Sequence, residues 1–256
     1  MDMVTSADGT TIAYRKAGSG PPIVFAAGAF NDHTRLQPLA DALAGEFTVV
    51  SYDRRARGAS GDTRPYAIDR EVEDLAAVLG VVGGSAAVFG YSSGAVLALY
   101  AATTLPITHL FLYDAPFAVD GVPRRGDLPD RLDALVQAGR PGDAVALFQT
   151  EGIGLPPEVV AQIRQSPMWP ALEAIAQSTV YDATITTELA TPTPEMAAVT
   201  VPTLVLTGVG TWPQLTRAAK ELGLGQHVEV PGGENHDLPV EATAAEVRAF
   251  LTVDRP

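Results

Sequence analysis

Short apolar runs alternate with amphipathic segments of helical length along most of this chain, and this alternation limits its possible folds most strongly. The predicted strands lie at residues 23–27, 48–52, 86–89, 109–113, 203–207 and 227–230. Helical spacing of apolar residues marks 34–44, 69–79, 93–104, 214–222 and 242–251. Strands that alternate with helices in this way form parallel sheets covered on both faces. We therefore predict an α/β fold with a mostly parallel, doubly wound sheet and an antiparallel edge hairpin near residues 10–16.

The pattern changes between about residues 117 and 198, where helical stretches follow one another and no strand is evident. The stretches lie at 132–138, 143–148, 158–165 and 170–177, and prolines stand near their starts. We predict a helical cap insertion over 118–197, carried by a single core made of residues 1–117 and 198–256.

A serine motif lies where the third parallel strand should turn into a helix. The segment is Gly90-Tyr91-Ser92-Ser93-Gly94. A glycine-bounded turn with a serine helix cap is the simpler interpretation of these five residues. Between a strand and a helix, however, the pattern is typical of a nucleophile elbow, which holds the central serine outward at a helix N-terminus. Ser92 is thus the candidate nucleophile, and the amide of Ser93 is a candidate oxyanion donor.

A serine nucleophile needs a general base and an acid to orient it. Of the four histidines, His236 follows the last predicted strand and precedes the last helix, so it should emerge at the same sheet edge as Ser92. A surface-loop histidine is the alternative, and His33, after the first parallel strand, could either line the pocket or be solvated. Asp114 ends the strand 109–113 and precedes His236, as an orienting acid should in this chain order. It could instead cap the start of the insertion.

Composition excludes several other functions. The formal net charge of −13 disfavours nucleic acid and anionic membranes as partners, and no apolar run approaches the ~20 residues of a membrane-spanning helix. The chain has no cysteine, and no two-histidine metal spacing lies on one helix, so we expect neither thiol chemistry nor a metal. The first residues show no secretory signal pattern, which favours a cytoplasmic protein. We expect a small-molecule substrate and no cofactor; the oligomeric state is left open.

The elbow, the run from Tyr52 to Ser60 and His236 together resemble the α/β-hydrolase superfamily over most of the chain. The resemblance implies an eight-stranded sheet, a helical lid and an acyl-enzyme mechanism without a cofactor. It also implies hydrolysis of an ester, lactone, amide or thioester. The second oxyanion donor would be the amide of Ala29.

Three positions depart from the family pattern. Ala27-Gly28-Ala29 replaces the usual His-Gly, and Ala56 replaces a usual glycine. No carboxylate follows the strand 203–207, where the family acid commonly lies. Asp114, at the end of the preceding strand, is therefore the candidate acid.

Several aromatic or apolar residues are candidates for a substrate pocket, although ordinary packing explains most of them equally well. They are Phe30, Tyr91, Met168, Trp169 and Trp212. The leading function is a serine hydrolase, carboxylesterase-like, acting on a small and rather apolar substrate. The alternatives are a cofactor-free cyclase, acyltransferase or lyase, and a non-catalytic ligand-binding homologue. The arginines at 54, 55 and 57 are expected to form structural ion pairs that fix their turn rather than to bind an anion.

Overall fold

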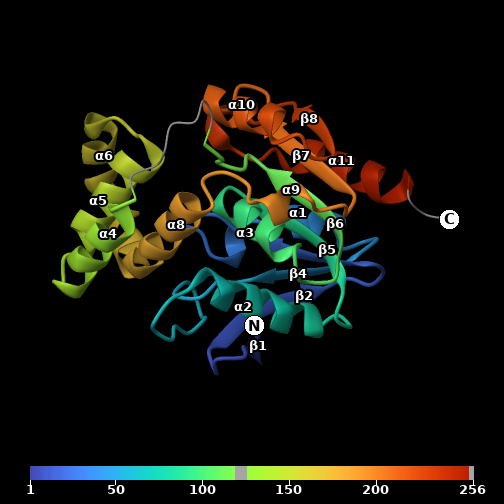
Figure 1. Cartoon of the computed structure of the whole chain (residues 1–256), viewed down its shortest axis with the longest axis horizontal. Helices are drawn as coiled ribbons and strands as arrows, with labels where there is room; N and C mark the ends of the chain where they lie inside the picture. Colours follow the sequence, from blue (N-terminus) through green and yellow to red (C-terminus); the bar gives the residue numbers. More distant parts are fainter. Residues whose placement is uncertain (119–125, 254–256) are drawn as a thin grey trace.

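The computed structural model describes residues 1–118 and 126–253 and is built around one eight-stranded sheet (Figure 1). Its strands are β1 (Asp2–Thr5), β2 (Thr11–Ala17), β3 (Pro22–Ala26), β4 (Thr48–Tyr52), β5 (Ala86–Tyr91), β6 (Ile107–Tyr113), β7 (Thr203–Gly208) and β8 (Gln226–Val230). They lie in the order β1-β2-β4-β3-β5-β6-β7-β8. β2 runs antiparallel to β1 and β4, and the remaining pairs are parallel. The mostly parallel sheet with an antiparallel edge hairpin is confirmed.

Helices cover both faces of the sheet, as the doubly wound prediction requires. One face packs against α1 (Gln37–Leu43) and α11 (Val240–Val253). The other face packs against α2 (Ile68–Gly80), α3 (Ser93–Ala101) and α10 (Pro213–Leu222). The central strand β5 is buried along its whole length because it is covered from both sides. Short helical turns η1 (His33–Arg35), α9 (Pro194–Ala197) and η3 (Glu234–His236) complete the core.

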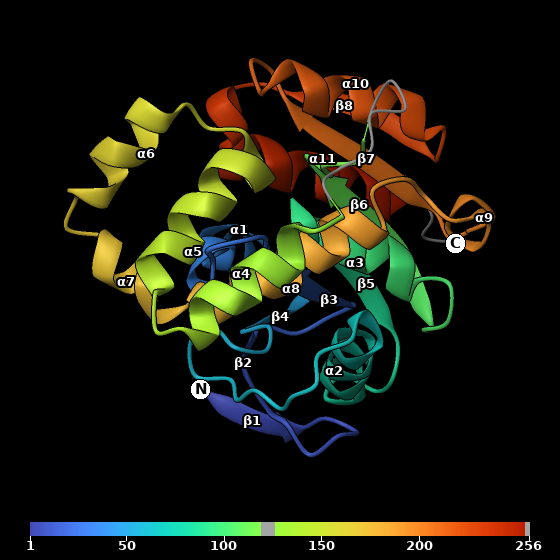
Figure 2. The same ribbon diagram turned by 60° about the vertical axis from the view of Figure 1, so that its left-hand side comes forward.

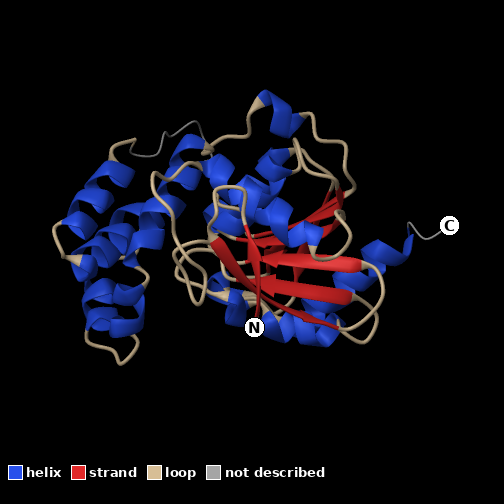
Figure 3. Ribbon diagram, turned by 90° about the horizontal axis from the view of Figure 1, so that it is seen from below, coloured by secondary structure: helices blue, strands red, loops and turns tan. Residues whose placement is uncertain are grey.

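A helical insertion between β6 and β7 lies to one side of the sheet (Figures 1 and 2). It contains α4 (Leu128–Gln137), α5 (Pro141–Leu147), the π-helical turn η2 (Phe148–Ile153), α6 (Pro157–Arg164), α7 (Trp169–Ala174) and α8 (Ala176–Glu188). Figure 3 shows this cap as helices alone beside the red strands. The helical insertion is thus confirmed; its exact boundaries, 118–197, stay a prediction, and residues 119–125 and 254–256 lie outside the described residues.

The sequence does not predict α8 as a helix of its own. Nine of its residues are buried, and they include polar ones such as Ser178, Thr179 and Asp182. A helix enclosed on most sides by other elements shows no apolar stripe against a polar face, so the periodicity that reveals surface helices is missing.

Across residues 1–118 and 126–253, every helix is too short or too polar to cross a bilayer.

Candidate active site

Ser92 lies at a sharp turn between β5 and α3. Its backbone has φ 56° and ψ −125°, a left-handed conformation that a non-glycine residue rarely adopts. A side chain at Gly90 would meet the backbone of α3, and one at Gly94 would meet the carbonyl oxygens of Ala26 and Ala27 at the end of β3. The two glycines therefore let strand and helix approach closely enough to form this turn.

Asp114 follows β6, beside the strand that carries Ser92, and its side chain is fully buried. Its Oδ2 atom lies 2.9 Å from Nδ1 of His236 and accepts a hydrogen bond of 2.8 Å from Oγ1 of Thr211. Thr211 follows β7 and His236 follows β8, so the carboxyl ends of three neighbouring strands converge here. The structure thus brings Asp114 and His236 together across 122 positions of sequence.

Two aromatic rings hold the imidazole of His236. The rings of Tyr91 and Trp212 stack on it, with centroids 4.9 Å and 5.0 Å away. The Tyr91 hydroxyl also donates a hydrogen bond to the carbonyl oxygen of His236. Burial raises the pKa of Tyr91, although the nearby Arg35 opposes this, so the phenol stays protonated and keeps its role as donor. The ring orientation of His236 is set by these contacts and by Asp114.

A cavity of about 170 Å³ opens over the elbow. Within the described part of the chain its lining comprises Ala29, Asn31, Tyr91, Ser92, Ser93, Pro116, Phe117, Phe148, Gly152, Ile153, Thr186, Trp212, Gln214, Leu215 and His236. Ser92 and His236 share this cavity, but among the described residues no hydrogen bond joins the serine hydroxyl to the imidazole. Such contacts between nucleophile and base often tighten only when substrate binds.

Two backbone amides at this cavity are available to a ligand. Those of Ala29 and Ser93 donate to no acceptor within residues 1–118 and 126–253. Ala29 follows β3, and Ser93 is the first residue of α3, where the helix dipole favours negative charge. The absence of the family histidine at position 27 leaves the Ala29 amide in place at the cavity.

Three predicted pocket residues lie elsewhere, whereas Tyr91 and Trp212 do line the cavity. Phe30 packs edge-on against the ring of Phe148, Trp169 is buried inside the cap, and Met168 is exposed. We therefore leave Phe30, Met168 and Trp169 out of the proposed substrate site.

The sequence analysis does not predict several of the residues that line the cavity. Pro116 and Phe117 lie two and three positions after Asp114, so their position just after a strand is a signal that could have indicated them. Phe148, Ile153 and Thr186 come from the cap, where no local pattern tells which side chains face the core.

The arginines after β4 form buried ion pairs, as expected, but their partners are distant in sequence. Arg54 donates from Nε and Nη2 to both oxygens of Glu71 on α2. Arg55 reaches Asp74 on α2 and Asp8 in the β1–β2 turn. Arg57 donates to Asp182 on α8. The ion pairs of this turn therefore connect the hairpin, α2 and the cap, rather than joining residues within the turn.

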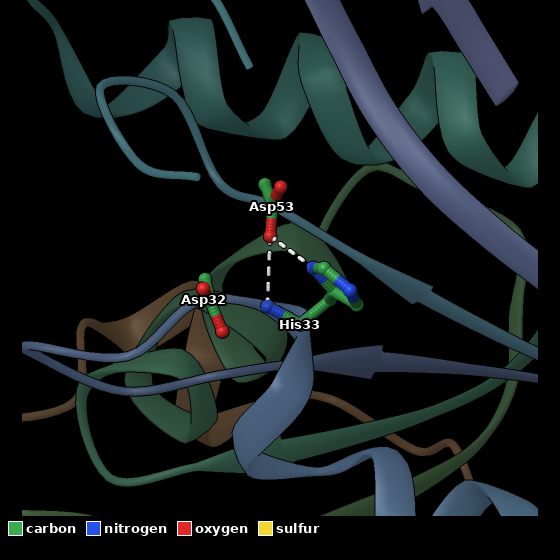
Figure 4. Close-up of side chains that lie close together, drawn as sticks. All are labelled: Asp32, His33 and Asp53. Atoms are coloured by element: carbon green, nitrogen blue, oxygen red, sulfur yellow. Dashed lines mark hydrogen bonds and ion pairs between the residues drawn. The ribbon is translucent and has the colours of Figure 1, made fainter. Parts of the chain in front are cut away.

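His33 lies away from the cavity lining, in a cluster with Asp32 and Asp53 whose potential ligand atoms lie within 4.8 Å of one another (Figure 4). Asp53 Oδ1 lies 2.7 Å from Nδ1 of His33 and accepts from the His33 amide, while Oδ2 accepts from the Ala59 amide. Asp32 accepts from Thr34 and caps η1. Because these carboxylates already bond to the chain, the cluster anchors the loop after β3 to the loop after β4.

A family pattern and two solved structures that resemble this chain are all described as alpha/beta hydrolases or esterases. The sequence pattern described as the alpha/beta hydrolase family matches residues 23–250. An alpha/beta hydrolase from Sphaerobacter thermophilus is 45% identical, with a TM-score of 0.89 over 98% of this chain and 100% of that one. The esterase RhEst1 from a Rhodococcus species is 25% identical, with a TM-score of 0.68 over 98% of both chains.

Curated relatives match over shorter segments. The 2-(acetamidomethylene)succinate hydrolase of Mesorhizobium japonicum is 30% identical over 132 residues, which are 50% of this chain and 46% of that protein. The chain thus spans less than half the length of the curated relatives it matches.

Proposed function

This chain belongs to the alpha/beta hydrolase family, and from that premise we propose that it is a serine hydrolase acting through an acyl-enzyme on Ser92. Its substrate would be an ester, lactone, thioester or amide. The observation that carries the proposal is the 2.9 Å contact between Asp114 and His236 at the cavity that also holds Ser92. An orienting acid, a base and a nucleophile at one cavity are the requirements for activating a serine hydroxyl.

In the proposed reaction, His236 takes the proton of the Ser92 hydroxyl as its oxygen attacks the acyl carbon. Asp114 holds the imidazole tautomer and stabilises the imidazolium that forms. The amides of Ala29 and Ser93 bind the oxyanion, and His236 returns the proton to the leaving group. Water, deprotonated by His236, then attacks the acyl-enzyme. The bond to the Ser92 oxygen breaks as His236 returns the proton to that oxygen, which releases the acid and restores Ser92.

The cavity lining supports a small, uncharged acyl group. Phe117, Phe148, Ile153 and Leu215 supply apolar surface, while Asn31, Thr186 and Gln214 are neutral polar groups. The described lining includes no lysine, arginine, aspartate or glutamate side chain. An acyl chain of a few carbons would fill about 170 Å³ without requiring a counter-ion. The similarity to an esterase agrees with this substrate class.

We expect a fluorophosphonate probe to label the folded protein at Ser92, because only an activated serine attacks phosphorus at a useful rate. Intact mass should rise by one adduct, and peptide mapping should place it on Ser92. Ser92→Ala and heat-denatured wild type should take no label.

Turnover of nitrophenyl acetate and butyrate then tests whether the labelled protein is a hydrolase. Absence of a Ser92 adduct on the folded wild type would remove the proposed nucleophile. Labelling without ester turnover would instead favour a cyclase, acyltransferase or lyase.

A further inference from the structure

Four buried charged side chains lie next to the elbow and are not among the residues that line the cavity. They are Arg54, Arg57, Glu71 and Asp182, each with a side chain at most 1% exposed. Arg54 forms a two-pronged contact with Glu71, with distances of 2.6 and 2.8 Å. Asp182 accepts from Nη1 of Arg54 at 3.0 Å and from Nη2 of Arg57 at 2.6 Å. Two positive and two negative groups thus compensate one another away from water.

This cluster touches the two segments that carry the proposed oxyanion donors. The Ser93 hydroxyl donates to Oδ1 of Asp182 at 2.7 Å, and Ser93 supplies one donor amide from its own backbone. Arg54 Nη1 donates to the carbonyl oxygen of Ala27 at 3.1 Å, two residues before the second donor, Ala29. Asp182 also accepts from that Nη1. Its carboxylate is therefore hydrogen-bonded directly to Ser93 and, through Arg54, to the segment that contains Ala27.

We propose that Asp182, on cap helix α8, is a positioning residue that holds the Ala29 and Ser93 amides in register as an oxyanion hole. The proposal rests on the serine-hydrolase function proposed above. It assigns the cap a part in the chemical step as well as in enclosing the substrate.

Asp182 performs this role as an anion. Burial raises its pKa, but the charges of Arg57 and Arg54 outweigh burial and hold the pKa below its usual range. A neutral amide at this position could still accept one hydrogen bond, but it would leave the buried cluster with one uncompensated positive charge. The arginines would then shift toward other acceptors or water and carry the Ala27 and Ser93 segments with them.

The same helix contacts the substrate cavity. Thr186 lines it, lies one turn beyond Asp182 on the same side of α8, and donates from its hydroxyl to the Asp182 carbonyl oxygen at 2.9 Å. A displacement of α8 would therefore alter the acyl pocket and the oxyanion donors together.

The test compares Asp182→Asn with Asp74→Asn, each assayed for nitrophenyl acetate hydrolysis and for stability in urea. Asp74 makes an equally buried two-pronged contact with Arg55 in the same loop, but it touches neither Ser93 nor Ala27. For Asp182→Asn we expect kcat to fall about 10- to 100-fold with KM changed less than about threefold, because oxyanion contacts strengthen in the transition state. Asp74→Asn neutralises a comparably buried carboxylate and should keep kcat within about twofold, whatever stability it loses.

A boronic acid that forms a tetrahedral adduct with Ser92 gives a second measurement. Its inhibition constant should rise about 10- to 100-fold in Asp182→Asn and stay near the wild-type value in Asp74→Asn. If the two variants lose kcat and inhibitor affinity equally, Asp182 has only a structural role and the proposal is wrong.

Ser93→Ala decides the question if Asp182→Asn does not fold. It removes the hydroxyl link to Asp182 but keeps the donor amide, so kcat should fall about 10-fold with little change in KM. An unchanged kcat would overturn the proposal. A wild type that takes no Ser92 label and hydrolyses no ester would instead refute the serine-hydrolase function, and this proposal with it.

Discussion

Asp114 combines three unusual properties at one residue. It is fully buried, its φ is 48°, and a single oxygen, Oδ2, serves both His236 and Thr211. A buried carboxylate is costly unless donors compensate its charge. The Thr211 hydroxyl donates to Oδ2, and Nδ1 of His236 lies within hydrogen-bonding distance of the same oxygen, so two neighbouring groups hold this carboxylate in place.

Asp114→Asn should lower kcat/KM for ester hydrolysis by about 10²- to 10⁴-fold, because an amide no longer fixes the imidazole tautomer or stabilises the imidazolium. Steady-state kinetics on nitrophenyl acetate measure the change. Asp237→Asn is the matched control, since Asp237 adjoins His236 but directs its carboxylate to Arg35 at the surface. An unchanged rate in Asp114→Asn would exclude it as the orienting acid.

At the scale of elements, the site depends on how closely β3, β5 and α3 approach one another. The elbow places Ser92 in a left-handed conformation, and the glycines on either side permit the contact between strand and helix. The strained backbone conformation at Ser92 persists because the packing of the surrounding strands and helix stabilises it.

Gly94→Ala should destabilise the fold by about 1–3 kcal/mol, because the added methyl group would press against the carbonyl oxygens at the end of β3. Urea unfolding measures the loss. Gly80→Ala is the control: it adds the same methyl group at the end of α2, where no atom lies within 4 Å. Helix propensity predicts a gain of up to about 1 kcal/mol there. Equal stability of the two variants would contradict the close approach at the elbow.

At the scale of the whole molecule, the loop after β4 joins parts that the sheet alone does not connect. Through Arg54, Arg55 and Arg57 it binds the edge hairpin, α2 and the cap helix α8. The pairs of Arg54 and Arg57 are fully buried, and Asp8 is half-buried, so removing one partner of a buried pair leaves an uncompensated charge and costs more than breaking a surface pair would.

At low pH, protonation of Asp8 should weaken the ion pair between Asp8 and Arg55. Burial raises the pKa of Asp8, but hydrogen bonds from Thr10 and the contact with Arg55 prevail and lower it from 3.8 to about 2. Because the folded-state pKa lies below the unfolded value, the carboxylate stabilises the fold above pH 3.8, and this contribution is lost as the pH falls toward 2. Unfolding free energies of wild type and Asp8→Asn should therefore differ by a constant amount near neutrality and converge between about pH 4 and 2. A difference that does not depend on pH would contradict the ion pair.

The sequence by itself determined the α/β class, the parallel sheet with its antiparallel edge, the helical insertion and the turn that carries Ser92. Each of these follows from residues that are neighbours in the chain: apolar periodicity, glycine spacing and helix breakers are local signals. The positions of His236 and Asp114 after strands were also local, which is why both could be proposed before their contact was seen.

The tertiary structure decided which side chains meet. Thr211 donates a hydrogen bond to Asp114. Phe148 and Thr186 of the cap line the cavity, whereas Met168 and Trp169 do not. Asp182 accepts a hydrogen bond from Ser93, 89 positions away in the sequence. Helix α8 escaped prediction because it is enclosed, and the partners of the arginines escaped it because charge carries no information about distance along the chain. Contacts of this kind arise when separate elements pack, and no local pattern encodes how the cap lies on the sheet.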